Sequence, residues 1–318
     1  NSIFIPSSLT AIHGSSFYLA DYDQPFDGVS NFTVYIDNDN TYLSSNVYTR
    51  NMRTTFFGGS NVDIIRVGCS GINASTGSIE IGSVVTMINA NAFSECTALS
   101  SIEFESGSHL SEIGVSSFYH SGLISLTMPS SLKTIGNSAF AGCSSLISLV
   151  FESKSSLTVI ENYAFQSATS LTGLTIPASI TSINSNVFEG VSDFTVYIDN
   201  DNSYLPSSTY NRSIGTSFFG GSDVTIIRIG CEGVDTSKNS IIIGSVVTEI
   251  AKNSFKNCTN LLSISFETDS QLQIIGDMAF SESQLTNISI PKSVISIGDS
   301  AFANCNNLSR VELDANPY

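Results

Sequence analysis

The sequence predicts a repeat solenoid that is mainly β, in which short parallel strands stack coil upon coil. Short irregular or 3-10 turns should connect the strands, and few or no long helices are expected. Three recurring features carry this prediction: a Phe every 22 to 25 residues, an Ile about five residues before it, and a short alternating apolar run after it. A fixed period of this length is typical of solenoids, whose units bury their apolar side only against neighbours. The recurring phenylalanines are Phe93, Phe118, Phe140, Phe165, Phe188, Phe255, Phe280 and Phe302.

A larger repeat lies on top of this short period. Residues 32–99 align without a gap with residues 194–261, an offset of 162 from Phe32 to Phe194, and the match includes FTVYIDNDNTYL against FTVYIDNDNSYL. We therefore predict a single solenoid domain over residues 1–318, with an internal duplication in which about 31–156 is repeated at about 193–318.

Each regular unit follows one plan. An alternating run, such as 123–129 or 171–177, predicts a strand, and Pro129 or Pro177 follows where a missing N–H is tolerated. A turn, a second short extended piece and the Phe corner complete the coil. We expect the strands of successive coils to form one parallel sheet over a continuous core. Each buried Phe should contribute about 2–3 kcal/mol before chain entropy is counted.

Two segments depart from this plan, at 31–71 and 193–233. Each holds two predicted strands, FTVYI and then DIIRV or TIIRI, around a stretch rich in turn residues. We expect an irregular, hairpin-like unit here. The segment 13–27 is a further irregular excursion.

Composition excludes several classes of function. The net charge is −16, with 28 acidic against 12 basic residues, so nucleic acid and anionic membrane are disfavoured as partners. No run of eighteen apolar residues is present, which predicts no transmembrane segment. Only 13% of residues are charged, so Ser, Thr and Asn must cover a surface unlike that of a typical cytosolic protein. The chain starts without Met, and we expect it to be part of a longer protein.

The six cysteines are expected to be buried thiols. Four of them, Cys96, Cys143, Cys258 and Cys305, share one place in F-x-x-C, and Cys69 and Cys231 are equivalent to each other in the duplication. Cys96 and Cys143 lie two coils apart, roughly 10 Å at strand spacing, which is too far for a disulfide. Disulfides remain the alternative for an even count.

Catalytic, metal and cofactor sites are not predicted. The runs at 37–40 and 199–202 (DNDN) resemble a calcium loop, but the Gly and Glu that such a loop needs are missing, and Asx-rich turns form without metal. The three histidines lie in different units, and no G-x-S-x-G is present. We therefore expect no enzyme, no metal and no cofactor.

At this level of detail the chain resembles a known family. The pattern IP-x-S-[LVI]-T-x-I-x-x-x-A-F-x-x-C-x-x-L-x-x-I-x-[FL], seen at 130–151, 176–188 and 290–313, is similar to the BspA-like, or Treponema pallidum-type, leucine-rich repeats. Residues 35–55 resemble an insert found between such repeats, with Phe56 or Phe218 where Leu is usual. The resemblance implies a leucine-rich-repeat solenoid of an extracellular or surface-attached protein, often linked to adhesion, without shared catalytic residues.

The open face of the sheet is the expected binding site, because solenoids usually bind extended partners there. Alternation predicts that one row of side chains points outward, and aromatic and guanidinium groups are the better anchors within it. The candidate ligand-binding residues are Tyr35, Arg66, Glu80, Glu103, Tyr197 and Arg228.

The leading hypothesis is a non-enzymatic binding or adhesion solenoid of a secreted or cell-surface protein. It would recognise an extracellular protein or glycan through the sheet face or the two irregular loops. Two alternatives stay open: an architectural spacer or intracellular protein-interaction scaffold, and a polysaccharide-processing enzyme on a parallel β-helix, which would need a carboxylate cluster in a groove.

Overall fold

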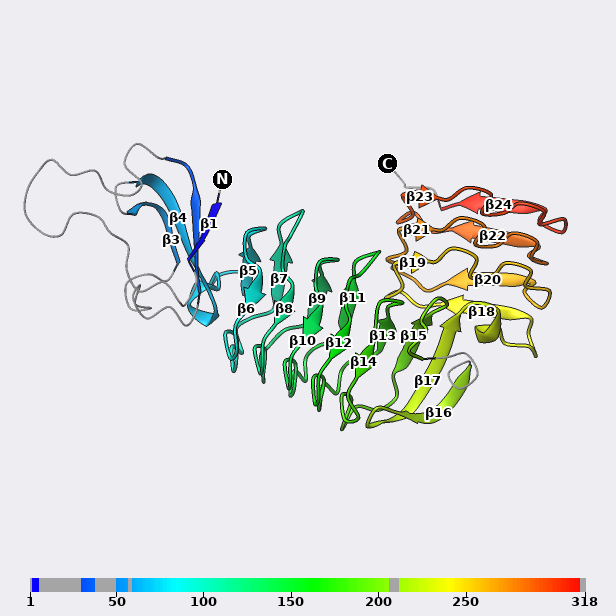
Figure 1. Cartoon of the computed structure of the whole chain (residues 1–318), viewed down its shortest axis with the longest axis horizontal. Coiled ribbons are helices and arrows are strands. Elements are labelled where there is room, and N and C mark those ends of the chain that lie inside the picture. Colours follow the sequence, from blue (N-terminus) through cyan, green and yellow to red (C-terminus); the bar gives the residue numbers. More distant parts are fainter. Residues whose placement is uncertain (1, 6–29, 38–49, 57–58, 206–211, 315–318) are drawn as a thin grey trace, which may run out of the picture.

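The fold is a parallel β-solenoid of about 10 turns with almost no helix, as the sequence predicts. In the computed structural model, residues 2–5, 30–37, 50–56, 59–205 and 212–314 are described. The strands fall into three blocks that follow one another along the chain (Figure 1). The two short 3-10 elements, η1 (Cys69–Gly71) and η2 (Cys231–Gly233), lie where one block gives way to the next.

The N-terminal block is a four-stranded sheet with the order β1-β2-β4-β3. Strands β1, β2 and β4 are parallel, whereas β3 pairs antiparallel with β4 as the other half of a hairpin. The bounds are β1 (Ser2–Ile5), β2 (Thr33–Asp37), β3 (Arg50–Phe56) and β4 (Gly59–Val67).

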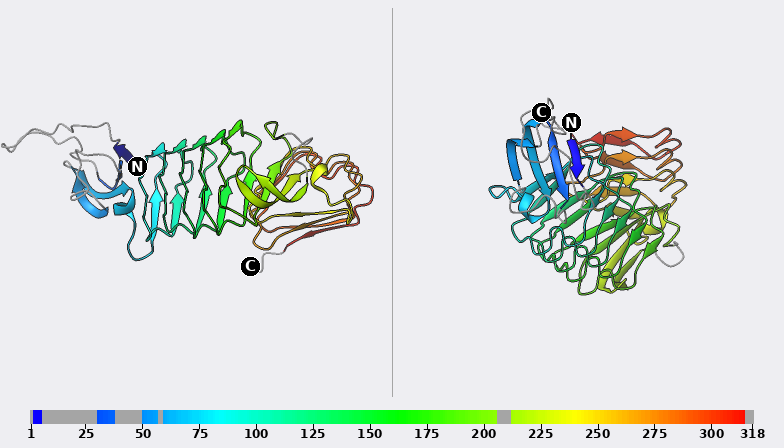
Figure 2. Two further views of the ribbon diagram at one scale, coloured as in Figure 1. Left: turned by 90° about the horizontal axis from the view of Figure 1, so that it is seen from below. Right: turned by 60° about the vertical axis from the view of Figure 1, so that its left-hand side comes forward.

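The central stack has one long-strand sheet and one short-strand sheet, which together wrap each coil (Figure 2). The long strands are β5 (Ser78–Ile81), β7 (Ser101–Phe104), β9 (Ser125–Met128), β11 (Ser148–Phe151), β13 (Gly173–Ile176), β15 (Thr195–Asp199) and β17 (Gly221–Ile229), with β16 (Ser213–Phe218) at the edge. The short strands are β6 (Met87–Ile88), β8 (Glu112–Ile113), β10 (Thr134–Ile135), β12 (Val159–Ile160) and β14 (Ser182–Ile183).

The C-terminal stack repeats this plan, but its strands run at a steep angle to those of the central stack (Figure 1). Its long strands are β18 (Ser240–Ile243), β20 (Ser263–Phe266), β22 (Asn287–Ile290) and β24 (Arg310–Leu313). Its short strands are β19 (Glu249–Ile250), β21 (Ile274–Ile275) and β23 (Ser296–Ile297).

The prediction of one continuous parallel sheet is wrong, and the hairpins give the physical reason. A strand has two hydrogen-bonding edges, and β17 uses one for β15 and the other for the antiparallel β16. No edge is left for β18, so the chain begins a new sheet. The β3–β4 hairpin precedes β5 in the same way. The buried core divides accordingly into two clusters, the second built mainly from residues after Ile227.

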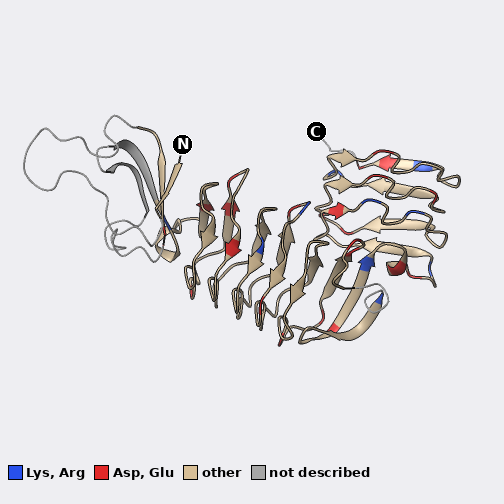
Figure 3. Ribbon diagram, in the orientation of Figure 1, with Lys and Arg blue, Asp and Glu red and all other residues tan. Residues whose placement is uncertain are grey.

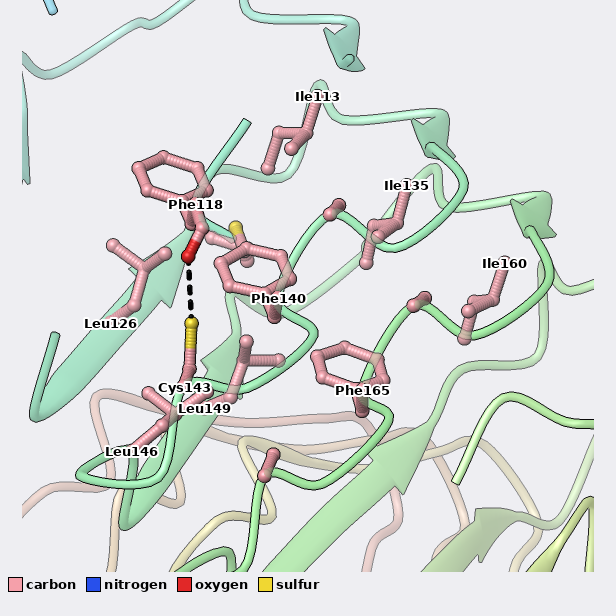
Figure 4. Packing of buried hydrophobic residues seen from close by; sticks show 14 of the residues in the cluster. Ile113, Phe118, Leu126, Ile135, Phe140, Cys143, Leu146, Leu149, Ile160 and Phe165 are labelled. Carbon is pink, nitrogen blue, oxygen red and sulfur yellow. Dashed lines mark hydrogen bonds between the residues drawn. The ribbon is translucent and has the colours of Figure 1, made fainter. Parts of the chain in front are cut away.

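The predicted phenylalanine column is confirmed, with a gap at the boundary between the stacks. Successive rings lie 5.0 to 5.6 Å apart and within 8° of parallel, both in the run from Phe93 to Phe188 and in the run from Phe255 to Phe302. Figure 4 shows Phe118, Phe140 and Phe165 in this column, flanked by one Ile from each coil. Offset parallel rings at such separations are a favoured aromatic geometry.

Each Phe turns inward because the backbone around it is sharply curled. The residue two positions after every column Phe has a positive φ, for example Glu95, His120 and Gly142. The residue two positions before it also has a positive φ in seven of the eight corners, for example Asn91 and Ser116. The Phe N–H then donates to a carbonyl of the next coil, as from Phe118 to Ala139 at 2.8 Å. Coil register and ring stacking therefore reinforce each other.

The last coil shows what a coil loses without a following neighbour. All four residues of β24 are exposed, and Leu313 is 71% exposed. Its counterpart in the duplication, Phe151, is 3% exposed because further coils follow it. The apolar side chains of a coil are thus buried only when another coil packs against it.

Replacing Phe140 with Ala should lower the free energy of unfolding by about 3–5 kcal/mol, because a large side chain is lost from a fully buried position. Replacing Ile147, which is 49% exposed, with Ala is the control and should change it by less than about 1 kcal/mol. Equilibrium urea unfolding measures both. Equal losses for the two variants would contradict the packing described.

Candidate functional site

The open face of the central stack is the candidate site, and strand register arranges its residues in rows. Glu80 on β5 pairs with Glu103 on β7, and Thr127 on β9 pairs with Val150 on β11. Because side chains alternate along a strand, these residues project from the same face of the sheet.

A hollow of about 690 Å³ lies on this face. Strands β7, β9 and β11 form its floor, and Ser245, Asp269 and Gln271 of the C-terminal stack contribute to its lining. The sequence alone could not predict that these C-terminal residues line the hollow, because their position depends on the angle between the two stacks. The side chains of the floor are mostly small and polar: Ser101, Glu103, Ser125, Thr127, Ser148 and Glu152.

Glu80 and Glu103 lie exposed on the face, as the sequence predicts. They are register partners on neighbouring strands, which lie about 4.8 Å apart. Like charges in such a pair repel each other. Lys and Arg are sparse over the central stack (Figure 3), and none is found among the described residues that line the hollow.

Other carboxylates next to the face have structural roles. Glu105 accepts a hydrogen bond from the Ser83 N–H at 2.7 Å, and Glu152 accepts one from the Ser130 N–H at 2.8 Å. The Ser83 N–H and hydroxyl hold the pKa of the Glu105 carboxyl below its usual value. These carboxylates therefore accept hydrogen bonds from backbone N–H groups in the turn of the preceding coil.

The prediction that Tyr35, Arg66, Tyr197 and Arg228 point outward into solvent is wrong. Their exposed fractions are 5%, 0%, 4% and 1%. They lie on the last parallel strands before each change of block. Tyr35 and Tyr197 are on the outer face, which the following block covers. Arg66 and Arg228 pair in register with Ile36 and Ile198 and are therefore on the opposite, inner face, one residue out of phase with the prediction. Sequence reasoning treated these strands as part of one uninterrupted sheet.

The two tyrosines mark these block boundaries with the same contact. A Cβ added to Gly82 would lie 2.1 Å from the ring of Tyr35, and one added to Gly244 would lie 2.3 Å from the ring of Tyr197. The tyrosine ring therefore requires a glycine at the position directly after β5 and β18. Burial also raises the pKa of Tyr197.

The two arginines donate to backbone carbonyls at the end of the neighbouring parallel strand, β2 for Arg66 and β15 for Arg228. Arg228 donates to the carbonyls of Asp199, Asn200 and Leu205, the first two at 3.2 and 3.1 Å. Arg66 donates to the carbonyl of Asp37 at 2.9 Å, the same contact in the first copy. Burial lowers the pKa of both guanidinium groups. Their role in this structure is to satisfy buried backbone carbonyls.

Arg228→Ala should lower the free energy of unfolding by about 2–4 kcal/mol, because it leaves buried carbonyls without donors. The control is Arg310→Ala, whose side chain is 71% exposed and whose ion pair with Glu312 lies at the surface. Thermal and urea unfolding of both variants provide the comparison. If Arg228→Ala unfolds like the unchanged chain, the loop does not depend on this side chain.

Among the described residues, four side-chain hydrogen bonds attach the C-terminal stack to the central stack. The Thr248 hydroxyl donates to the carbonyl of Phe151 at 2.9 Å, and the Thr175 hydroxyl donates to the carbonyl of Val246 at 3.2 Å. The Lys154 N–H donates to the carboxylate of Glu249 at 3.1 Å. The fourth joins Ser153 and Gln273. A smaller hollow of about 250 Å³ lies at this junction.

Asp199 lines the smaller hollow and is the most perturbed carboxyl there. Burial raises its pKa to about 7, the neighbouring Glu249 and Asp201 carboxylates also raise it, and the Ala178 N–H that it accepts at 3.1 Å lowers it. An unfolded Asp releases its proton near pH 3.8. The folded chain therefore keeps a proton that the unfolded chain has lost, and this contribution to stability is lost as pH rises from about 4 to about 7.

The free energy of unfolding of the unchanged chain should therefore fall between pH 5 and pH 8, whereas that of Asp199→Asn should not lose this contribution. The difference between the two chains should shift in favour of Asp199→Asn by on the order of 2 kcal/mol over this range. The neutral amide keeps an oxygen that can accept from Ala178. Asp223→Asn, at an exposed position, is the control for loss of one charge. Urea unfolding at the two pH values measures the differences. A difference that does not change with pH would exclude a titrating Asp199.

The expectation that all six cysteines are thiols is wrong for one pair. Cys69 and Cys96 form a disulfide, with 5.6 Å between their Cα atoms. The two residues lie one coil apart, a pairing that the comparison of Cys96 with Cys143 did not consider. Cys143 is a buried thiol as expected, and it donates to the carbonyl of Phe118 at 2.9 Å (Figure 4).

The DNDN runs are described only in part. Residues 38–40 of the first run lie outside the described residues. In the second, the Asn202 side chain donates to the carbonyl of Pro177 at 2.6 Å and accepts from the Leu205 N–H at 2.8 Å, so it fixes a turn. Within the described ranges, no group of three or more His, Cys, Asp or Glu residues is placed to hold a metal ion. The same residues include no helix long and apolar enough to cross a bilayer.

The family resemblance is confirmed. The model of the BspA-type leucine-rich-repeat region matches residues 72–195 and 234–317 in 6 copies, about two thirds of the chain, so the chain belongs to this family. The unmatched segment between the two ranges contains the β16–β17 hairpin and η2, where the regular coils are interrupted. A search among curated proteins found no match.

Solved structures of bacterial proteins are similar to this chain. The pneumococcal vaccine antigen PcpA shares 21% identity, with coverage of 92% of this chain and 73% of that one and a TM-score of 0.41. For a leucine-rich cell surface protein of Faecalibacterium prausnitzii the identity is 22%, the coverages 76% and 79%, and the TM-score 0.30. For a leucine-rich-repeat protein of T. pallidum the identity is 18%, the coverages 75% and 86%, and the TM-score 0.27.

Proposed function

We propose that the chain is a non-enzymatic binding module of a secreted or cell-surface protein, which recognises an extracellular protein or glycan through the face of the central stack. The observation that carries the proposal is the polar hollow of about 690 Å³ between this face and the C-terminal stack. Hydroxyl and carboxylate groups line much of it, beside the apolar residues Ile102, Phe104, Leu126 and Val150. Membership of the BspA-type family supports a binding role.

The lining suits a partner that brings hydrogen-bond donors. Serine and threonine side chains are short, and on successive strands they place hydroxyl donors and acceptors at regular intervals along the axis of the solenoid. An extended peptide or a sugar chain can contact several such strands at once, in the manner of other solenoid ligands. Nucleic acid is a poor partner for a face with these carboxylates and a net charge of −16.

The Glu80–Glu103 pair gives the face a preferred charge for its partner. Two exposed carboxylates in strand register repel each other in the unbound protein. A lysine or arginine of a partner placed between them would relieve that repulsion. A protein partner with a basic segment is therefore favoured, and its association should weaken as salt is added.

Catalysis is not part of the proposal. The carboxylates of Glu105, Glu152 and Glu267 accept backbone hydrogen bonds from Ser83, Ser130 and Ser245 and so are tied to turns. No cofactor is required for recognition of this kind.

One observation favours the alternative of an architectural spacer. The C-terminal stack covers the far end of the face, where Val150, Thr175 and Tyr197 are each 8% exposed or less. A partner therefore has access to the strands from β5 to β11 and not to those beyond them. In a spacer, the stacks would set length and angle, and partners would bind elsewhere.

The test compares binding of the chain to intact candidate host cells and to an array of extracellular-matrix proteins and glycans, with a heat-unfolded sample as a control. The double variant Glu80→Gln/Glu103→Gln should weaken saturable binding about tenfold, or about 1.4 kcal/mol, without lowering the melting temperature. Glu95→Gln/Glu189→Gln is the matched control, with the same charge change at exposed corner positions.

Three outcomes separate the hypotheses. Weaker binding by the face variant alone supports both the function and the site. Equal binding by both variants and the unchanged chain supports a binding module but overturns the site. No saturable binding at any salt concentration overturns the binding function and favours the spacer.

A further inference from the structure

The duplication places a second pair of cysteines in the setting of the first disulfide. Cys69 and Cys96 are bonded, and the offset of 162 residues carries them onto Cys231 and Cys258, which are thiols in this structure. Both pairs have the same sequence separation of 27 residues. The remaining two cysteines, Cys143 and Cys305, are also equivalent to each other and lie in other coils.

The backbone around the two pairs is the same. Each pair begins at the first residue of a 3-10 turn, η1 or η2, after a glycine with extended φ and before a residue with φ −66°. The second member of each pair donates its N–H to the carbonyl of the column phenylalanine three residues earlier, at 3.2 Å in both copies. Corresponding Cα atoms therefore occupy corresponding places in the two copies.

The sulfur atoms also point the same way. The Cys69 sulfur lies 3.7 Å from the carbonyl oxygen of Ser94, and the Cys231 sulfur lies 4.0 Å from that of Lys256, the equivalent residue. In the first copy this orientation brings Cys69 to bonding distance of Cys96. In the second copy it directs Cys231 toward Cys258.

We propose that Cys231 and Cys258 form a second disulfide, equivalent to Cys69–Cys96, when the chain meets a small oxidised disulfide such as oxidised glutathione. The Cys231 thiolate attacks one sulfur of that disulfide, forms a mixed disulfide and releases one small thiol. The Cys258 thiolate then attacks the Cys231 sulfur and releases the second small thiol. The two protons lost by the protein end on the two released thiols, so the oxidant is reduced by two electrons.

The electrostatics of the pair suit this order of attack. Interaction with the neighbouring Cys258 thiol lowers the pKa of Cys231, whereas the same interaction and burial raise the pKa of Cys258. Cys231 is also the more exposed of the two. The accessible, more acidic thiol is the better first nucleophile toward a small disulfide.

One contact in the second copy differs from the first and competes with the bond. The Cys258 thiol lies 3.2 Å from the side-chain oxygen of Asn260, a position occupied by Ala98 in the first copy. Closing the disulfide removes this weak thiol hydrogen bond. The exchange breaks one S–S bond and forms another, so the loss of this contact makes the second pair somewhat harder to oxidise than the first.

The consequence of two such bonds is mechanical. Each ties the turn that follows a hairpin to the first Phe corner of the next stack. The same cross-link would then fix both changes of direction in the solenoid. The inference does not depend on what the sheet face binds.

Non-reducing tryptic mapping tests the proposal on the whole chain. The chain is first equilibrated with oxidised and reduced glutathione, then unfolded in the presence of an alkylating reagent and digested. Cleavage after Arg228, Lys238, Lys256 and Lys292 places Cys231 and Cys258 on different peptides, 229–238 and 257–292. Cys69 and Cys96 stay within one peptide, 67–133, whose bridge serves as the internal reference.

The expected result is a linked pair of peptides 229–238 and 257–292, with alkylation confined to Cys143 and Cys305. An alkylated Cys231 in a sample with an intact Cys69–Cys96 bridge overturns the proposal. Failure of both pairs to oxidise also overturns it, because the first bridge is its premise.

A variant distinguishes a native bond from chance oxidation during unfolding. In Cys231→Ser, Cys258 should be alkylated together with Cys143 and Cys305. Mild reduction should lower the melting temperature of the unchanged chain, which has two bonds, by the larger amount. The variants Cys69→Ser/Cys96→Ser and Cys231→Ser/Cys258→Ser each keep a single bond, so mild reduction should lower their melting temperatures by less. A reductant-induced shift identical in the unchanged chain and in Cys231→Ser/Cys258→Ser contradicts the proposal.

Discussion

Every coil of this protein depends on the next coil to bury its apolar residues, and the phenylalanine column is the interaction that makes the dependence specific. The ring of one coil stacks on the ring of the next, while the Phe N–H bonds to a carbonyl of that coil. The exposed residues of β24 show the opposite case, a coil with one face unmatched. Stability in such an array is a sum over neighbours, as in other repeat proteins.

The hairpins β3–β4 and β16–β17 interrupt this regularity and give the molecule its shape. Because the antiparallel strand occupies the free edge, the next coil must start a new sheet at another angle. Tyr197 beneath Gly244 and Arg228 on the loop carbonyls fill the corner that results. The same change of direction brings Ser245 and Asp269 over the face of the central stack, so the candidate binding hollow is a product of the interruption.

The period predicted the coils and the Phe column, because each coil is a local unit whose pattern repeats in sequence. The family was indicated by the resemblance of the repeated motif. The same reasoning failed at the block boundaries. Alternation placed Tyr35 on an outer face, yet Tyr35 is buried because the following block covers that face. Arg228 was assigned to the wrong face, since it pairs in register with Ile198 on the inner side. Glu80 and Glu103 lie where the pattern holds and are exposed. The Cys69–Cys96 bond escaped prediction because the irregular unit hides which coil lies beside Cys69.

Hydrogen exchange of individual amides tests the coil-to-coil account most directly. The Phe118, Phe140, Phe165, Phe255 and Phe280 amides all donate to the following coil. The account predicts slow exchange for these amides in both stacks. It predicts much faster exchange for the Phe302 amide in the final coil, which has no such acceptor among the described residues. Exchange of the column amides at the rate of the final coil would contradict it, because the stacked coils would then open independently of their neighbours.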